Sequence, residues 1–228
     1  MQWAWLPAYL PALLQGLVTT LFVLFFSVII GFGLAIPLAL AQVHGRSLAQ
    51  KFSRGFCSYI RGTPLLMQLY LLYYGVGSLF PFIPGVREHF QWLVRLDAIY
   101  YVLAAFTLSF AGYEAEIMRG AFLSVPRGEL EAAEALGLSR AQVLWRIWFP
   151  SAFLKVLPTL TGEVIGQLKA TPLIFTVPVI DLMGVAQKVR HDTYLTYEPL
   201  LFVAAVYLAL TFVIVQLFAL AEPKHLRR

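Results

Sequence analysis

A carboxylate stands inside one of the apolar stretches of this 228-residue chain, because Glu163 lies between Ile147 and Leu168. Holding an ionised side chain at the centre of a bilayer costs about 3 kcal/mol, and such residues usually mark a path for a substrate or an ion. Lys155 lies eight residues earlier, about 12 Å along a helix, which is too far for a direct ion pair. We therefore expect Glu163 to contact a substrate, with a structural contact to Lys169 or another helix as the alternative.

Three further polar residues are candidates for the same path. Gln68 is an uncommon residue within an apolar segment and can form a hydrogen bond to a neighbouring helix. Thr171 and Asp181 bound a mostly apolar segment that two prolines interrupt. That segment is too short to cross a bilayer, and irregular backbone at membrane depth needs cover from protein or from a water-filled cavity. We expect residues 171–185 to form a re-entrant or gating segment, with a buried surface loop as the alternative.

Several kinds of chemistry are excluded by what the sequence lacks. It contains no Gly-Lys dipeptide and therefore no P-loop, so this chain is not expected to hydrolyse ATP. The four histidines are isolated and Cys57 is the single cysteine, so we expect no metal site, no internal disulfide and no cofactor on this chain. No nucleophile or paired-carboxylate constellation is evident. The chain is therefore expected not to be an enzyme.

Composition places the chain in a membrane. Its residues are 60% hydrophobic and 13% charged, with a mean hydropathy of +0.75, which is beyond the range of a soluble domain. A bilayer core needs about 20 apolar residues as a helix. We predict an all-α integral membrane fold, a single transmembrane domain over residues 1–228, with spans at about 13–40, 65–82, 98–118, 147–168 and 200–220. The fourth of these five spans has the weakest hydropathy because it contains Lys155 and Glu163.

Basic residues predict the orientation of the chain. Most of the 17 Lys and Arg residues lie in segments 44–61, 114–155 and 221–228, and such residues concentrate on the cytoplasmic side. This distribution predicts five spans with the N-terminus outside and the C-terminus inside. The first 43 residues carry no charge, which favours a permanent first span over a cleaved signal peptide. Because the net charge of +5 is spread over loops, nucleic acid is not an expected partner.

The cytoplasmic segment 124–146 is polar and predicts two short helices. Pro126 suits the first turn of a helix, acidic residues follow it, and Gly137 can adopt the left-handed conformation that ends a helix. Ser139 and Gln142 then have the spacing of a capping box. A polar helical hairpin in a membrane protein indicates a docking element for a partner outside the membrane. An ordinary cytoplasmic hairpin would have the same shape and is the alternative.

The spacing of residues in this hairpin resembles the EAA signature of the membrane subunits of ABC importers, a loop that docks into a groove on the ATPase subunit. Phe149 stands where that family usually has Leu. The resemblance implies that the matching residues couple this chain to an ABC ATPase dimer, which binds ATP and Mg²⁺. Those residues are Glu131, Ala132, Ala133, Gly137, Leu138, Ile147 and Pro150.

Two further motifs resemble the polar-amino-acid branch of these permeases. Residues 61–65 match its Arg-Gly-Thr-Pro-Leu motif. Residues 112–117 match its Ala-Tyr-x-Ala-Glu-Ile pattern, with Gly112 in place of the usual Ala. Glu116 is the carboxylate of the second motif, and Glu114 occupies its variable position. For both glutamates we favour pairing with Arg119 or framing of the hairpin over contact with substrate. The residues of the first motif are Arg61, Gly62, Thr63 and Pro64.

The resemblance implies a permease subunit of an ATP-driven ABC importer, a multi-pass protein of a bacterial inner membrane that translocates polar amino acids, with cationic ones such as histidine, lysine, arginine and ornithine favoured. The implied partners are an ABC ATPase dimer, a second permease that is a copy or a paralogue, a periplasmic solute-binding protein, the amino acid and membrane lipids. Two alternatives remain open. One is an ABC permease for another small polar solute. The other is an ion-coupled secondary carrier with Glu163 and Glu114 as ion sites, although carriers of that kind usually have internal repeats and none is obvious here.

Overall fold

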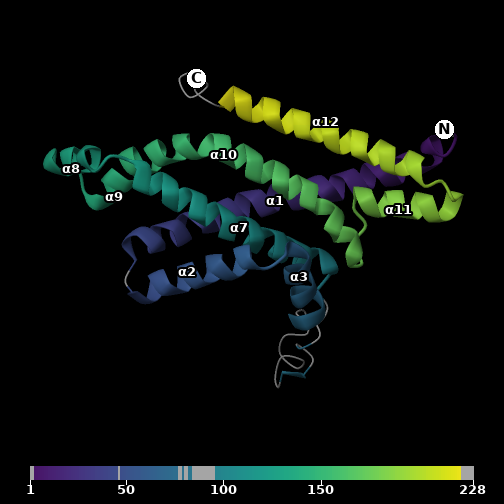
Figure 1. The fold of residues 1–228 in the computed structure, drawn as a ribbon, viewed down its shortest axis with the longest axis horizontal. Helices are drawn as coiled ribbons and strands as arrows, with labels where there is room; N and C mark the ends of the chain where they lie inside the picture. Colours follow the sequence, from purple (N-terminus) through teal and green to yellow (C-terminus); the bar gives the residue numbers. More distant parts are fainter. Residues whose placement is uncertain (1–2, 46, 77–78, 80–81, 84–95, 222–228) are drawn as a thin grey trace.

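The structure, a computed structural model, is a bundle of helices (Figure 1). It describes residues 3–45, 47–76, 79, 82–83 and 96–221, and no β-strand occurs among them. The α-helices are α1 (Leu6–His44), α2 (Ser47–Gly62), α3 (Leu65–Tyr70), α7 (Ala98–Ser124), α8 (Arg127–Ala135), α9 (Arg140–Val143), α10 (Phe149–Ala170), α11 (Leu182–Thr193) and α12 (Tyr197–Ala221). Two π-helical turns, η1 (Leu71–Val76) and η3 (Leu144–Trp148), and one 3₁₀ segment, η4 (Thr171–Thr176), connect them.

The long helices contain most of the predicted spans. In the described part of the chain, three helices are long and apolar enough to cross a membrane: Leu6–His44, Ala98–Ser124 and Tyr197–Leu220. The helix α10 has a comparable length of 22 residues but contains Lys155, Glu163 and Lys169, which explains its weak hydropathy. The predicted segment 147–168 therefore lies on a helix, while the number of spans and the orientation stay predictions.

The region of the second predicted span differs most from the expectation. The described residues of that segment are helical from Leu65 to Val76, six in α3 and six in η1, and much of the rest of segment 65–82 lies outside the described residues. Before it comes α2, a 16-residue helix where we expected only a cytoplasmic connection. One face of α2 is held to the preceding helix by side-chain hydrogen bonds, from Ser53 Oγ to Leu38 O at 2.8 Å and from Gln50 Nε2 to Gln42 O at 2.9 Å.

The central helix is α1, which packs most extensively against α7 and also contacts α2, α10 and α11. Close approach is possible because Gly31 has no side chain; a Cβ there would lie 3.0 Å from Thr107 O. The main apolar core fills the space between α1, α7 and α10. Its buried members include Leu24, Phe110, Met118, Phe122, Val156 and Leu160.

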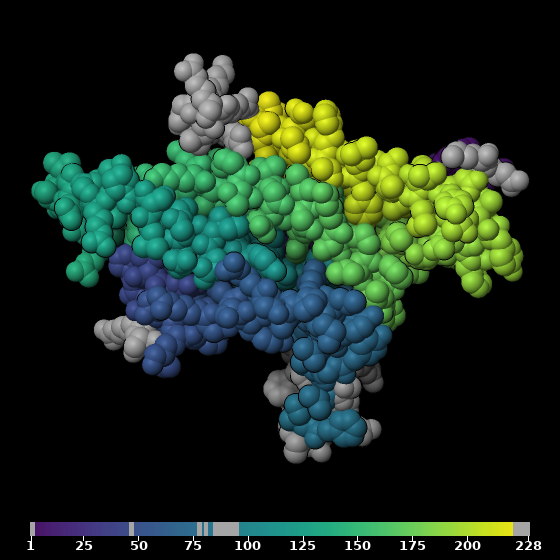
Figure 2. Space-filling model, in the orientation of Figure 1, coloured from purple at the N-terminus to yellow at the C-terminus, as the bar shows by residue number. Residues whose placement is uncertain are grey.

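The molecule is elongated along α1 (Figure 1). The hairpin formed by α8 and α9 lies at one end, and the start of α1 lies at the other end together with α11. The space-filling view in Figure 2 shows α12 lying along the outside of α10. Large apolar side chains on α12, such as Leu208, Phe212 and Leu217, are exposed, as expected for a helix that faces lipid.

The segment predicted to be re-entrant folds into two short helical pieces. After α10, η4 covers residues 171–176, and α11 begins at Leu182 after Asp181 caps it through Oδ1, which accepts a hydrogen bond from Gly184 N at 2.8 Å. Both pieces contact α1. Ile174 and Val177 are buried in a cluster with Val23 of α1 and with residues of α3 and α7, so the irregular backbone is covered by protein. A gating role for residues 171–185 stays a prediction.

Candidate functional site

The hairpin of α8 and α9 has the local structure that the sequence predicts. Its first helix ends at a residue with a φ of +83°, Gly137, whose N–H donates to Glu134 O at 2.9 Å. The next N–H, of Leu138, donates to Ala133 O at 3.2 Å. The second helix begins with the predicted capping box, in which the side chains of Ser139 and Gln142 each accept from the other's backbone N–H.

The EAA residues form one exposed surface with a small buried base. Glu131, Ala132, Gly137 and Pro150 are exposed, Leu138 and Ile147 are partly exposed, and Ala133 is buried. Sequence reasoning missed Leu136, whose side chain is 83% exposed at the tip of the hairpin. The signal in the sequence is a leucine directly before Gly137 in an otherwise polar hairpin. Large apolar side chains that are exposed outside lipid mark surfaces for a partner.

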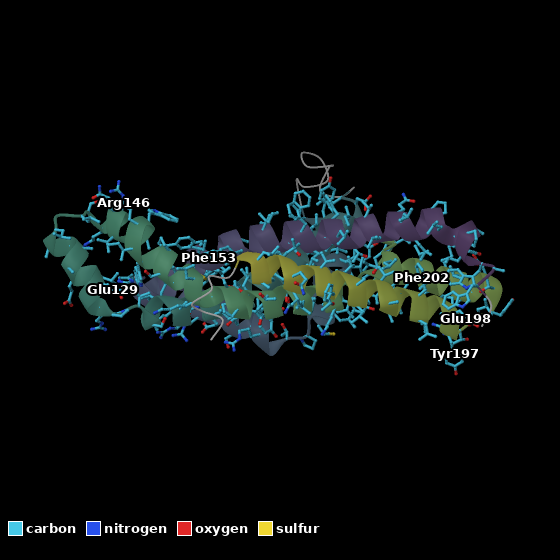
Figure 3. The ribbon with its side chains drawn as sticks, turned by 90° about the horizontal axis from the view of Figure 1, so that it is seen from above. Glu129, Arg146, Phe153, Tyr197, Glu198 and Phe202 are labelled. Carbon is cyan, nitrogen blue, oxygen red and sulfur yellow. The ribbon has the colours of Figure 1, made fainter. Side chains whose placement is uncertain are left out.

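The hairpin packs on the bundle through apolar side chains, because Leu130 of α8 and Leu144 after α9 lie against the main core. Next to it, the Nζ of Lys155 in α10 donates to Ser124 O at the end of α7, at 2.7 Å. A cavity of about 490 Å³ lies between the hairpin and the end of α1, lined by residues including His44, Leu130 and Trp148. Figure 3 shows Glu129 and Arg146 at this end of the molecule, opposite the end that holds Tyr197 and Glu198.

A second group of candidate residues lies where α2, α7 and α10 meet. The carboxylate of Glu116 accepts from Arg119 Nε at 3.0 Å, and its Oε2 lies 3.9 Å from Nη1 of Arg61. This confirms the expected pairing of Glu116 with Arg119. It also joins Arg61 of the first branch motif to Glu116 of the second, although the two residues lie far apart in the sequence.

Glu163 faces the same place from α10. A cavity of about 360 Å³ is lined by Glu163, Tyr113, Ile117 and the three charged residues Arg61, Glu116 and Arg119. A neighbouring cavity of about 270 Å³ is also lined by Glu163 and Tyr113, and it reaches Thr63 and Pro64 at the break between α2 and α3. The structure therefore brings both branch motifs and Glu163 around two adjoining cavities.

Gln68 forms the hydrogen bond to a neighbouring helix that we expected, while its place in the substrate path stays a prediction. Its Nε2 donates to Ile60 O at 2.9 Å, to Thr63 O at 3.0 Å and to Thr63 Oγ1 at 3.1 Å. The side chain therefore ties α3 to the end of α2 across the break that Gly62 and Pro64 create. Gln68 lines neither of the two cavities at Glu163, so the geometry indicates a positioning role at the break.

Thr171 and Asp181 are not brought together with Glu163. Thr171 Oγ1 donates to Leu168 O at 2.8 Å and lies 2.8 Å from the hydroxyl of Tyr207 on α12. Asp181 is buried as the cap of α11, and the adjacent Leu182 N donates to Thr20 Oγ1 at 3.2 Å. Neither residue lines the cavities at Glu163. Both lie at the junction of α1, α11 and α12, and their place in the substrate path stays a prediction.

Glu114 differs from its motif neighbour Glu116. We expected it to pair with Arg119 or to frame the hairpin, but among the described residues Arg119 is bonded to Glu116, and neither carboxylate oxygen of Glu114 has a hydrogen-bond partner. No cluster of three or more potential metal-binding side chains occurs within the same described residues.

Comparisons with known proteins agree with the motifs. Residues 27–227 match the family described as "Binding-protein-dependent transport system inner membrane component". The chain is 40% identical to the octopine transport system permease protein OccM of Rhizobium radiobacter over 92% of this chain and 84% of that protein. It is 37% identical to the histidine/lysine/arginine/ornithine transport system permease protein HisM of Escherichia coli K12, over 93% and 88%. It is 32% identical to the L-cystine transport system permease protein TcyL of Bacillus subtilis, over 95% and 88%.

Solved structures support the fold. A chain of an amino acid ABC transporter crystallised with histidines is similar with a TM-score of 0.80 and 28% identity, covering 97% of this chain and 98% of that one. A chain of the inward-facing MetNI methionine ABC transporter is similar in fold with a TM-score of 0.71 at 16% identity, over 96% of each chain.

The chain belongs to the family of inner membrane components of binding-protein-dependent transport systems. It is a multi-pass inner-membrane permease subunit of the amino acid ABC transporter group, with the helical fold of type I ABC importer permeases. The family implies an ATPase and a solute-binding protein as partners. The resemblance expected from the sequence is thus confirmed.

Proposed function

We propose that this chain forms one membrane half of an ATP-driven importer for cationic amino acids. The observation that supports this most is the position of Glu163, whose carboxylate lines two adjoining cavities between α7, α10 and the break before α3. An acidic residue on a span that faces a cavity is the expected partner for a cationic solute. Relatives whose names state octopine or histidine, lysine, arginine and ornithine as their substrates point the same way.

The charges around the cavity suit an α-amino acid as a whole. The side chain of Arg61 is 50% exposed and lies 3.9 Å from Glu116, so it is available to a carboxylate in the cavity. Arginine binds carboxylates through two parallel hydrogen bonds. A solute with its carboxylate towards Arg61 and its cationic end towards Glu163 would satisfy both groups.

The energy would come from an ATPase dimer docked on the hairpin of α8 and α9. ATP and Mg²⁺ would bind to that dimer, and a periplasmic solute-binding protein would deliver the amino acid. A second permease, either a copy of this chain or a paralogue, would form the other half of the path. Five spans, with the N-terminus outside and the C-terminus inside, would put the hairpin on the cytoplasmic side.

A permease of the same architecture for another small polar solute is the second candidate. The L-cystine permease TcyL is 32% identical to this chain, so relatives at this distance differ in the substrate that their names state. The charge on Glu163 separates the two candidates, because a neutral solute gains little from a carboxylate in the path.

The substitution Glu163→Gln tests the proposal, since it removes the charge and keeps the size. Uptake of arginine, histidine and glutamine would be measured per assembled complex, with Asp192→Asn at the far end of α11 as a control that removes a charge elsewhere. Hydrogen bonds to charged groups contribute roughly 1.5 to 3 kcal/mol, so arginine should bind about ten- to a hundredfold more weakly, with glutamine much less affected. Unchanged transport of all three amino acids would rule out Glu163 as the residue that recognises charge.

A further inference from the structure

The helix α2 presents an apolar surface that the described part of the chain leaves largely uncovered. Leu48 and Phe52 are 81% and 69% exposed, and Tyr59 is half-exposed. At about 100° per residue, these three side chains, which we call the α2 stripe, fall within about 40° of one another. They point away from Ser53 and Cys57, which are buried against the bundle. Large apolar side chains gathered on one exposed face indicate a surface that meets lipid or a partner.

Basic side chains flank the α2 stripe on one side. Lys51 and Arg54 are exposed, and within the described ranges neither takes part in an ion pair. The sequence of α2 contains no Asp or Glu that could neutralise them. At the other end of the helix, Arg61 already lies 3.9 Å from Glu116. The first half of α2 therefore combines uncompensated positive charge with exposed apolar surface.

The position of α2 fits the boundary between the acyl chains and the headgroups of a bilayer. The helix begins three residues after α1 ends, and Figure 1 shows its start at the end of the molecule that carries the α8–α9 hairpin. It then runs back beside α1, with hydrogen bonds to the backbone of Leu38 and Gln42. The first predicted span ends at about residue 40, so we expect the first half of α2 to lie at headgroup level.

We propose that this face of α2 binds an anionic phospholipid, with the acyl chains against the α2 stripe and the headgroup phosphate held by Lys51 and Arg54. Lys and Arg side chains reach headgroups from the membrane interface while their aliphatic stems stay on apolar surface. Amphipathic helices with basic flanks bind anionic membrane surfaces by the same combination of apolar burial and charge. This interaction does not depend on which solute the permease carries.

A protein partner fits these features less well than lipid does. It would have to bring an apolar groove for the α2 stripe together with acidic side chains for Lys51 and Arg54. A bilayer with anionic lipids supplies both, and this chain is already embedded in one. In the space-filling view of Figure 2, α2 forms an outer edge of the molecule, which leaves room for lipid along its length.

The test places a fluorescent probe in the middle of the α2 stripe. Gly55 suits this purpose because it is exposed and a Cβ there would meet no atom within 4 Å. The assembled importer with Gly55→Cys is labelled with bimane and reconstituted in liposomes that contain phosphatidylcholine and phosphatidylglycerol. Either the neutral or the anionic lipid carries brominated acyl chains, which quench the probe on contact. The same complex without the introduced cysteine gives the background labelling.

We expect the anionic lipid to be enriched about fivefold beside the probe, the ratio that the attraction of one basic side chain to an anionic surface provides. Lys51→Gln combined with Arg54→Gln should abolish this enrichment, and high salt should weaken it. The matched control combines Lys169→Gln with Lys188→Gln, which removes two exposed charges elsewhere and should leave the enrichment unchanged.

A second probe position reports on lipid contact without basic neighbours. Leu208→Cys lies on the exposed face of α12, and both brominated lipids should quench a probe there equally. Equal quenching by the two lipids at Gly55→Cys would overturn the proposal, because α2 would then face lipid without selecting its headgroup. A probe at Gly55→Cys that neither lipid quenches, while Leu208→Cys is quenched, would show that protein or water covers α2 and would equally overturn it. So would an enrichment that survives the loss of Lys51 and Arg54.

Discussion

The indole Nε1 of Trp148 donates a hydrogen bond to the backbone carbonyl of Phe122, with a donor–acceptor distance of 2.9 Å. The two rings also pack with their centroids 5.0 Å apart, and the ring of His44 contacts Trp148 edge-on at 4.7 Å. The ends of α1 and α7 are thereby joined to the residue that precedes α10, directly beside the α8–α9 hairpin. A displacement of the hairpin by a partner would therefore reach three helices at once.

Replacing this tryptophan should weaken that connection. Trp148→Phe keeps an aromatic ring and removes the hydrogen bond to Phe122, a loss of about 1 kcal/mol in the free energy of unfolding. We expect a lower midpoint of thermal unfolding in detergent and fewer amino acids transported per ATP hydrolysed. The matched control is Trp145→Phe, because the side chain of Trp145 is 58% exposed. Equal effects of the two substitutions would contradict a special role for Trp148.

The turn of the hairpin gives a second prediction. Gly137 has a φ of +83°, while a Cβ at this position would meet no atom within 4 Å. Strain in the backbone, rather than lack of space, should therefore decide the effect of a substitution. Gly137→Val should cost about 1 to 2 kcal/mol locally and lower both ATPase binding and transport, measured by co-purification and uptake. Gly137→Asn should be milder, because asparagine tolerates this conformation; a valine variant that binds the ATPase normally would contradict the docking role.

The glycine of the second motif gives a third prediction. A Cβ at Gly112 would lie 2.7 Å from Ile60 Cβ, whereas a Cβ at Gly33 would meet nothing within 4 Å. Alanine favours a helix over glycine by up to about 1 kcal/mol, but overpacking costs about 1 to 3 kcal/mol. Gly112→Ala should therefore lower the midpoint of thermal unfolding, and Gly33→Ala should keep or raise it. The explanation fails if both alanine variants are as stable as the wild type.

The single cysteine gives a fourth prediction, on α2. Cys57 is 1% exposed, and burial is the main cause that raises the pKa of its thiol. Since the thiolate is the reactive form, a maleimide at pH 7 should leave the folded protein unlabelled and should label it after denaturation in SDS. A cysteine introduced by Leu136→Cys, at the exposed tip of the hairpin, should react in the folded chain. Rapid labelling of folded Cys57 would show that α2 does not pack as described.

The hairpin could be predicted from the sequence because its signals are local. A helix stop at Gly137 and a capping box at Ser139 depend only on residues a few positions apart, and the structure has both. The helix α2 was missed because it is too polar on average for a span, although Phe52, Phe56 and Ile60 recur at the four-residue spacing of an amphipathic helix.

The candidate site could be predicted only in part, since it depends on which helices meet. The acidic residue Glu163 stood out within an apolar segment, and the structure places it at a cavity with both branch motifs. Thr171 and Asp181 looked equally suitable but lie at another junction of helices. The isolation of Glu114 follows from the packing of α7 against its neighbours, and no spacing in the sequence shows it.

The most direct test of the account is the source of energy for uptake. The complex of this chain with its ATPase, second permease and solute-binding protein would be reconstituted in liposomes, and arginine uptake followed with and without ATP and with ion gradients imposed or collapsed. We expect accumulation that requires ATP at the face that carries the hairpin, is lower in Gly137→Val and persists when proton and sodium gradients are collapsed. Accumulation driven by an ion gradient without ATP would contradict the account and favour an ion-coupled carrier.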